Sequence, residues 1–360
     1  MTISQLNNLF QFFRALVNDW LSFWLIRTET INHQLAALFE QNYAQPVDQL
    51  LISMIFGRTK AFSQELRLKF NLIGMLHVVC ASGFNVSLVA GLLQKLLQSW
   101  FPRRILAWVL IAGVWFYWLI AAGGLALTRA ALMISFKLVC RYIWMRQYRP
   151  LASLFFSACL IVLLSFDNLN SISFQLTVAA TVGMLIFSRV ENRYGQEAEE
   201  RELLFELSAD QPIRNWLKRV KKLIIQSFIS TVFAQLAVLP LILYYFGELS
   251  WVSFLSNSLI LWLVPIMTIL GLIWSFLGLG LQFVPGGQIA TQILAWPLFW
   301  LAELFIFLTT QLSYLGSPWQ VAEFNLAMVV AWYVVLIFLY KLYKFSLKYR
   351  KLALLRRFLK

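Results

Sequence analysis

Long apolar runs separated by short polar segments dominate the chain from residue 71 onward. Several of these runs exceed the roughly 18 apolar residues that a helix needs to cross about 30 Å of hydrocarbon. The pattern therefore predicts an all-α, polytopic membrane helical bundle of about nine spans. We place these spans at residues 71–98, 104–122, 125–145, 151–166, 172–190, 223–246, 257–283, 288–315 and 325–345.

The less apolar segments divide this bundle into parts. Residues 1–26 read as an amphipathic helix at the membrane interface, with a first span as the alternative. The segment after the fifth span holds seven acidic and seven basic residues, which is typical of a helix lying along the cytoplasmic surface. The predicted parts are an N-terminal segment at 1–48, a first membrane half at 49–190, a cytoplasmic linker at 191–222, a second membrane half at 223–345 and a basic tail at 346–360.

The first predicted span contains a polar break. The stretch IGMLHVVCASGFNVSLVAGLL, residues 73–93, carries His77 and the sequence Ser82-Gly83-Phe84-Asn85. Gly and Asn are poor helix formers, and irregular backbone at this depth survives only when it is buried in protein or lines a wet cavity. Two interpretations stay open: an interrupted or re-entrant helix of the kind found at transport sites, and a kinked but continuous helix in which Gly83 is a packing notch.

The span at 125–145 carries three cations, Arg129, Lys137 and Arg141. Their spacing of eight and four residues places them near one face of a helix. A charge near the bilayer centre costs roughly 2.5–3.5 kcal/mol, so an interaction must compensate the charge of Lys137. That interaction is either a structural ion pair, with Glu303 as the deep acidic partner, or contact of this helix face with water or a passing anion.

Further polar and helix-bending residues lie inside the predicted spans. Together they describe a bundle with a polar, non-uniform interior, although each alone is ordinary helix–helix contact material. They are Gln175, Thr177, Gln226, Gln235 and Asn257, with Pro240, Pro265 and Pro297.

The net charge of +14 has two readings. An excess of Lys and Arg in cytoplasmic loops is ordinary for a membrane protein, whereas a polyanionic partner is the alternative. The C-terminal stretch KLYKFSLKYRKLALLRRFLK has eight basic residues and no acidic one. The positive-inside rule therefore predicts a cytoplasmic C-terminus, with the basic residues of 58–70 as the exception to this orientation.

The sequence does not favour an enzyme. It contains only two histidines, His33 and His77, so the usual clusters of metal ligands cannot form around them. Cys80 stands three residues after His77, but no carboxylate is nearby to orient a nucleophile. We therefore expect no catalytic residues, no metal and no cofactor.

The broken span resembles the signature of the ComEC competence family, the DNA-uptake channels of bacteria. The matching residues are Gly74, His77, Ala81, Ser82, Gly83, Asn85 and Val86. Three later segments are similar to family motifs in the same order. The first is FYWLIAAGGLALTRAALM, which places Arg129 and Ala130 on a family motif. The second is ISFQLTVAATVGML, which matches at Gln175 and has Thr177 where the family usually has Ser. The third is FAQLAVLPLILYYFGELSWVSFLSNSLI, which matches at Gln235, Pro240, Phe246, Gly247 and Asn257. The resemblance covers residues 50 to about 275.

The resemblance implies a channel that takes single-stranded DNA across the cytoplasmic membrane during transformation. His77, Ser82, Gly83, Asn85, Arg129, Lys137, Gln175, Gln235, Pro240 and Asn257 are then candidates for the DNA path or for its structural motifs. The implied partners are single-stranded DNA and the bilayer. Long family members also carry OB-fold and nuclease domains, for which we expect no counterpart in this sequence. The resemblance therefore implies a separate DNA receptor, nuclease and translocase. Whether the protein forms a homo-oligomer is left open by the sequence. The alternative function is a secondary transporter or permease for a small anion.

Overall fold

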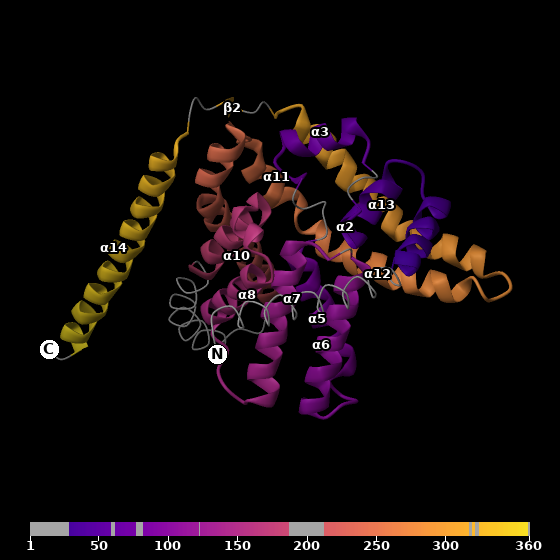
Figure 1. Ribbon diagram of the computed structural model, residues 1–360, viewed down its shortest axis with the longest axis horizontal. Helices are drawn as coiled ribbons and strands as arrows, with labels where there is room; N and C mark the ends of the chain where they lie inside the picture. The colour runs from indigo at the N-terminus through magenta and orange to yellow at the C-terminus, as the bar shows by residue number, and fades with distance from the viewer. Residues whose placement is uncertain are drawn as a thin grey trace, which may run out of the picture. The chain divides into compact units, whose positions relative to one another are not determined.

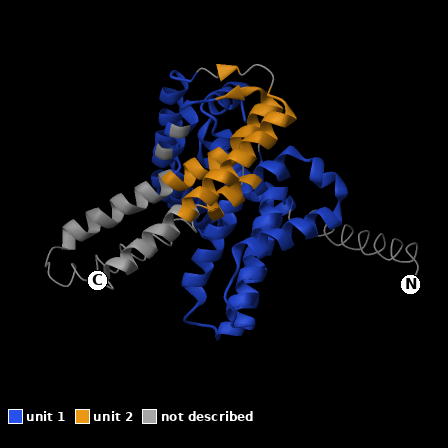
Figure 2. Ribbon diagram, turned by 90° about the vertical axis from the view of Figure 1, so that its left-hand side faces the viewer, with its two compact units in different colours: residues 1–178, 250–317 blue, residues 179–249, 318–360 orange. Residues whose placement is uncertain are grey.

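The computed structural model describes residues 29–58, 62–76, 82–121, 123–186, 212–316, 319–320 and 324–358, with the backbone alone at 212–228, 254, 258, 344 and 346–358. Within these ranges the protein is helical apart from one pair of two-residue strands. It forms two compact units (Figure 2). Unit 1 comprises residues 1–178 and 250–317, and unit 2 comprises residues 179–249 and 318–360. Each unit therefore combines segments from both halves of the chain.

A short, entirely buried helix lies inside unit 1. This helix, α2 (Val47–Phe56), has all ten residues buried and packs against α12 (Leu263–Leu281) and α13 (Gly287–Ser313) (Figure 1). Beyond its first turn its sequence, VDQLLISMIF, is apolar except for Ser53, as expected of a helix surrounded by protein. Ten residues are too few to cross a bilayer, so α2 is a core element and not a span.

The α2 core is completed by two shorter helices of unit 1. These are α3 (Gln64–Leu72), which packs against α13, and α11 (Val252–Ile260), which packs against the same helix. The break between α11 and α12 divides the predicted span 257–283. Pro265 consequently lies in the first turn of α12, where its missing N–H costs no helical hydrogen bond, and it does not bend a span as the sequence predicts.

Four further helices of unit 1 form a second group (Figure 1). In this group α5 (Gly83–Leu97), α6 (Arg103–Ile120) and α7 (Leu125–Leu138) pack against one another, and α8 (Pro150–Leu164) packs on α7. Indole hydrogen bonds join α6 to α7, from Trp115 to Ser135 and from Trp118 to Thr128. A π-helical segment, η2 (Val139–Ile143), continues α7, and a 3₁₀ turn, η3 (Phe166–Asn170), follows α8.

Unit 2 is built on a long helix pair. Its members are α10 (Pro212–Phe246) and α14 (Leu326–Phe358), and the strands β1 (Glu248–Leu249) and β2 (Trp319–Gln320) pair antiparallel beside them. The helix Ile172–Ile186 enters this unit at residue 179. There Gly183 meets α10 so closely that a Cβ would lie 2.5 Å from the carbonyl oxygen of Phe233. The glycine therefore permits a contact that any side chain would block.

The structure is that of a multi-pass, all-α membrane protein. Among the described residues, five helices are long and apolar enough to cross a bilayer: Arg103–Ile120, Ile229–Phe246, Leu263–Leu281, Gly287–Ser313 and Leu326–Tyr343. The expected number of about nine spans is not reached by this measure, because several predicted spans are shorter helices of 10 to 17 residues. The predicted span 71–98 is also not one helix, since α3 ends at Leu72 and α5 begins at Gly83.

Candidate functional site

The interruption of the first predicted span is held by side chains from another segment. After α3 ends, Gly74 adopts a positive φ of 67°, which only glycine adopts at no steric cost. The carbonyl oxygens of Leu72 and Ile73 accept hydrogen bonds from the hydroxyls of Ser250 and Ser256, the latter at 2.9 Å. In the described residues the predicted span is therefore not one helix, and Ile73 and Met75 beside Gly74 are buried in protein, one of the two environments that allow irregular backbone.

The helix resumes earlier than the sequence predicts. Ser82 is extended, with φ −107° and ψ 164°, and α5 begins at Gly83, so that Gly83, Phe84 and Asn85 form its first turn. The expectation of an uncoiled turn at 82–85 is therefore wrong for 83–85. Gly83 serves close packing: a Cβ at this position would lie 3.0 Å from the Cβ of Ala130 and 3.3 Å from the carbonyl oxygen of Ala126 in α7.

Asn85 has a structural contact that the sequence does not reveal. Its side chain is fully buried, and its Nδ2 donates to the carbonyl oxygen of Met54 at 2.8 Å. The hydroxyl of Tyr117 in α6 donates to the next carbonyl, that of Ile55, at 2.9 Å. Because the last four carbonyls of a helix have no partner within it, these two side chains provide donors for the C-terminal end of α2.

Arg129 lies beside the start of α5. Its side chain is only 8% exposed, and its Nε and Nη1 atoms are buried without a hydrogen-bond partner. Its Nη2 lies 3.7 Å from the position that a Cβ on Gly83 would occupy. The ion pairs found among the described residues, His33–Glu29 and Lys69–Glu65, do not involve it. The site therefore holds a buried cation whose charge the described side chains do not balance.

The other two cations of this segment lie in a different environment from Arg129. Lys137 and Arg141 are exposed, so the three cations do not share one environment. Arg141 lies in η2, with its guanidinium 5.7 Å from the ring centroid of Tyr142. In the described part of the chain no ion pair joins Lys137 to Glu303, which removes the structural pair that the sequence offers as one explanation for Lys137.

Gln175 and Asn257 lie in unit 1 with different roles. The side-chain amide of Gln175 donates to the carbonyl oxygen of Leu169 at 2.9 Å and so closes the η3 turn. Asn257 is 4% exposed inside α11, and its Oδ1 has no hydrogen-bond partner. Further buried oxygens of unit 1 without partners are those of Asn32, Ser53, Asn85, Thr268 and Thr309. The expected polar interior is therefore present in this unit.

Gln235 and Pro240 lie in unit 2, on α10. Gln235 is half-buried and Pro240 is buried. Proline has no N–H, so the carbonyl oxygen of Leu236, four residues earlier, loses its helical partner. The indole Nε1 of Trp332 in α14 donates to this oxygen at 3.1 Å, and the Tyr333 hydroxyl donates to Ala237 O at 2.8 Å. The proline thus creates an acceptor that the neighbouring helix uses.

A scan against protein-family models matches residues 54–345 to the competence protein family. The match covers most of the chain. This protein belongs to the competence protein family. The predicted resemblance is confirmed, and the match extends past residue 275, where the sequence motifs alone end. No curated protein and no solved structure matches the chain.

One candidate site residue of this competence protein cannot be placed. His77 lies outside the described residues, as do Cys80 and Ala81. In the described ranges, no group of three or more His, Cys, Asp or Glu side chains is placed to hold a metal ion.

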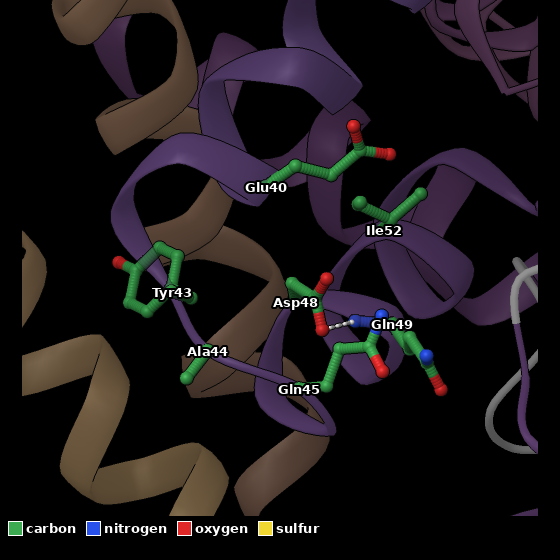
Figure 3. Close-up of a pocket in the computed structure, with 7 residues that line it drawn as sticks. All are labelled: Glu40, Tyr43, Ala44, Gln45, Asp48, Gln49 and Ile52. Atoms are coloured by element: carbon green, nitrogen blue, oxygen red, sulfur yellow. Dashed lines mark hydrogen bonds between the residues drawn. The ribbon is translucent and has the colours of Figure 1, made fainter.

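A pocket of about 430 Å³ lies elsewhere in unit 1 of the competence protein (Figure 3). Glu40, Asp48, Tyr43, Gln45 and Gln49 contribute to its wall. Burial raises the pKa of the Asp48 carboxyl, outweighing the hydrogen bond that it accepts from the N–H of Gln49 at 2.7 Å, and the nearby Glu40 raises it further. An acidic wall repels phosphate groups, so this pocket is a poor place for nucleic acid.

Sequence reasoning missed three side chains in unit 1, Tyr117, Ser250 and Ser256, and one side chain in unit 2, Trp332. Each donates to a main-chain carbonyl at an irregular point, which is a helix end, a break or a proline. The proline at 240 predicts that some donor is needed near Leu236. Nothing local in the sequence of the competence protein identifies the donor, because it comes from a segment 96 residues away.

Proposed function

We propose that the chain is a channel that passes single-stranded DNA across the cytoplasmic membrane during natural transformation. The observation that carries this proposal is the family match over residues 54–345 in a multi-pass helical protein. A strand carries one negative charge per nucleotide and needs cations to enter a low-dielectric slab. The buried Arg129 and the exposed Lys137 and Arg141 are basic groups of the kind that a strand requires.

In this proposal the C-terminus lies in the cytoplasm, since its basic residues follow the positive-inside rule. Separate proteins capture the DNA, degrade one strand and drive transport. The aromatic residues, 15 Trp, 12 Tyr and 31 Phe, supply more than enough rings for base stacking. Most of them pack in the bundle or lie at membrane interfaces.

The test is DNA uptake by a strain that lacks this protein. The strain is given labelled duplex DNA, and the label protected from external nuclease is measured after lysis. We expect the deletion to abolish internalised single strands and the wild-type copy to restore them. An Asn85→Asp or Arg129→Met copy tests the site, with membrane abundance measured by an epitope tag. Normal uptake in the deletion strain refutes the proposal.

A small-anion permease is the second candidate, because a single buried guanidinium fits a small anion as well as it fits one phosphate of a strand. Purified protein in liposomes separates the two functions. A channel for strands carries a labelled oligonucleotide that is not displaced by excess nucleoside monophosphate. A permease carries the monophosphate or inorganic phosphate and excludes the oligonucleotide.

A further inference from the structure

The electrostatic environment of Arg129 is incomplete. Its guanidinium is buried, and neither Nε nor Nη1 has a hydrogen-bond partner. A buried charge that is not paired is strongly destabilising, and polar groups inside membrane proteins face the bundle interior or water and mark ligand pathways. Among the described residues, no carboxylate forms an ion pair with it. An anion that reaches the guanidinium therefore supplies the hydrogen-bond acceptor and the countercharge that the described side chains do not.

The start of α5 adds a second positive feature at the same place. The first N–H groups of a helix have no acceptor within it, and the helix dipole makes this end positive. The usual compensations are not present: Ser82 makes no side-chain capping bond, and the first turn of α5 has no acidic residue. The Asn85 side chain, which is in that turn, is directed to Met54 instead. The side chains of the cap and of the first turn therefore do not compensate the Gly83 and Phe84 amides.

The two features lie within reach of one ligand. Arg129 Nη2 is 3.7 Å from the point where a Cβ on Gly83 would stand. Because Gly83 has no side chain, the guanidinium of Arg129 lies close to the first turn of α5. A cation and a positive helix end repel each other unless an anion lies at both, and helix N-termini with a nearby basic group bind phosphate in this way.

We infer that Arg129 and the amino-terminal amides of α5 form a binding site for one phosphodiester group. The inference rests on the proposed function for the source of the group, which is then a phosphate of the translocating strand. Arg129 binds two of its oxygens through the planar guanidinium, and the Gly83 and Phe84 amides bind the same group. One such site binds one phosphate at a time, so the strand is held weakly enough to move on.

Binding of an oligonucleotide to the full chain in nanodiscs of zwitterionic lipid tests this site. The probe is a fluorescent single-stranded 12-nucleotide DNA, titrated at several salt concentrations. Loss of one phosphate contact lowers the slope of log K against log[salt] by about 0.7. We expect Arg129→Met to lower the slope by this amount and the affinity by about tenfold or more. Arg103→Met, which removes an exposed arginine at the start of α6, leaves both close to wild type. Equal slopes for wild type and Arg129→Met overturn the inference.

Thermal melting without DNA distinguishes a ligand site from a structural role. If Arg129 is an anion-binding residue that is unoccupied without DNA, Arg129→Met melts at the same temperature as the wild type or higher, because the substitution removes an uncompensated buried charge. Added inorganic phosphate then raises the melting temperature of the wild type and of Arg103→Met, but not of Arg129→Met. A lower melting temperature for Arg129→Met with an unchanged phosphate response shows a structural arginine and overturns the inference.

The source of the phosphodiester is tested with nanodiscs that contain phosphatidylglycerol. If this lipid stabilises the wild type through Arg129 and the oligonucleotide does not compete, the group belongs to a lipid headgroup and the assignment to the strand is refuted. Failure of the proposed function gives a different result. In that case the deletion strain still takes up DNA, whereas the Arg129-dependent phosphate response of the purified protein persists.

Discussion

The side-chain amide of Asn85 donates a hydrogen bond of 2.8 Å to the main-chain carbonyl of Met54. Asn85 belongs to the first turn of α5, and Met54 belongs to the last turn of the buried helix α2. The residue that interrupts the apolar pattern of residues 73–93 is therefore a cap for another helix. Its polarity serves α2, and Gly83, two residues earlier in the same turn, lies next to Arg129.

Replacing Asn85 by Ala should destabilise the protein. The change leaves the Met54 carbonyl buried without this donor, which costs about 1–3 kcal/mol. The measurement is thermal or denaturant unfolding of the purified protein in detergent. Ser87→Ala is the control, because Ser87 is exposed on the same helix and bonds only weakly to the Gly83 carbonyl at 3.5 Å. Equal losses for the two variants contradict the capping role.

Trp332 should matter only as long as residue 240 is proline. Trp332→Phe removes the donor to Leu236 O and should cost about 1 kcal/mol or more. In a Pro240→Leu background the N–H of residue 240 donates a hydrogen bond to the Leu236 carbonyl oxygen. The loss of unfolding free energy caused by Trp332→Phe should therefore be smaller in that background. A double-mutant cycle by unfolding measures this coupling.

Tyr333→Phe is the matched control for this cycle. It removes the bond to Ala237 O, whose helical partner is the N–H of residue 241 and not of residue 240. Its cost should therefore be the same with proline or leucine at 240. If the tryptophan and tyrosine variants show the same coupling, the compensation is not specific to the carbonyl that the proline exposes.

Adding a methyl group at two glycines of α5 should have opposite effects. Gly83→Ala brings a Cβ to 3.0 Å from the Cβ of Ala130 and close to the Ala126 carbonyl, and overpacking of this kind costs typically about 1–3 kcal/mol. Gly91→Ala meets no atom within 4 Å and should stabilise the helix by roughly 0.8–1.0 kcal/mol. Unfolding of both variants compares them directly, and a neutral Gly83→Ala argues against the close α5–α7 contact.

Asp48 should make stability depend on pH. Burial raises the pKa of its carboxyl in the folded state, so the folded protein holds this proton at a pH where the unfolded chain has released it. Stability is then highest below the unfolded pKa and falls as the pH rises through the folded value. Asp48→Asn keeps an oxygen for the Gln49 N–H and removes the charge. We expect it to raise the melting temperature by about 2 °C at pH 7, with the difference vanishing in acid. A variant less stable than wild type at pH 7 rules this out.

The apolar runs by themselves determine that the chain is a helical, multi-pass membrane protein, and the ordered motifs around Gly83, Arg129, Gln175 and Pro240 determine its family. Both are local properties, since length, hydropathy and motif order are written along the chain. Most predicted spans in the described ranges correspond to helices, and the break before α5 is visible in the sequence.

Only the tertiary structure decides what the polar residues do. Asn85 bonds Met54 across 31 positions, Trp332 bonds Leu236 across 96 and Ser256 bonds Ile73 across 183. Arg129 is buried while Lys137, on the same helix, is exposed. Residues eight apart on a helix differ by about 80° in direction at 3.6 residues per turn, so the packing of α5 against α7 selects one cation and leaves the other outside. Such pairings depend on which helices meet, and hydropathy along a single chain does not contain that information.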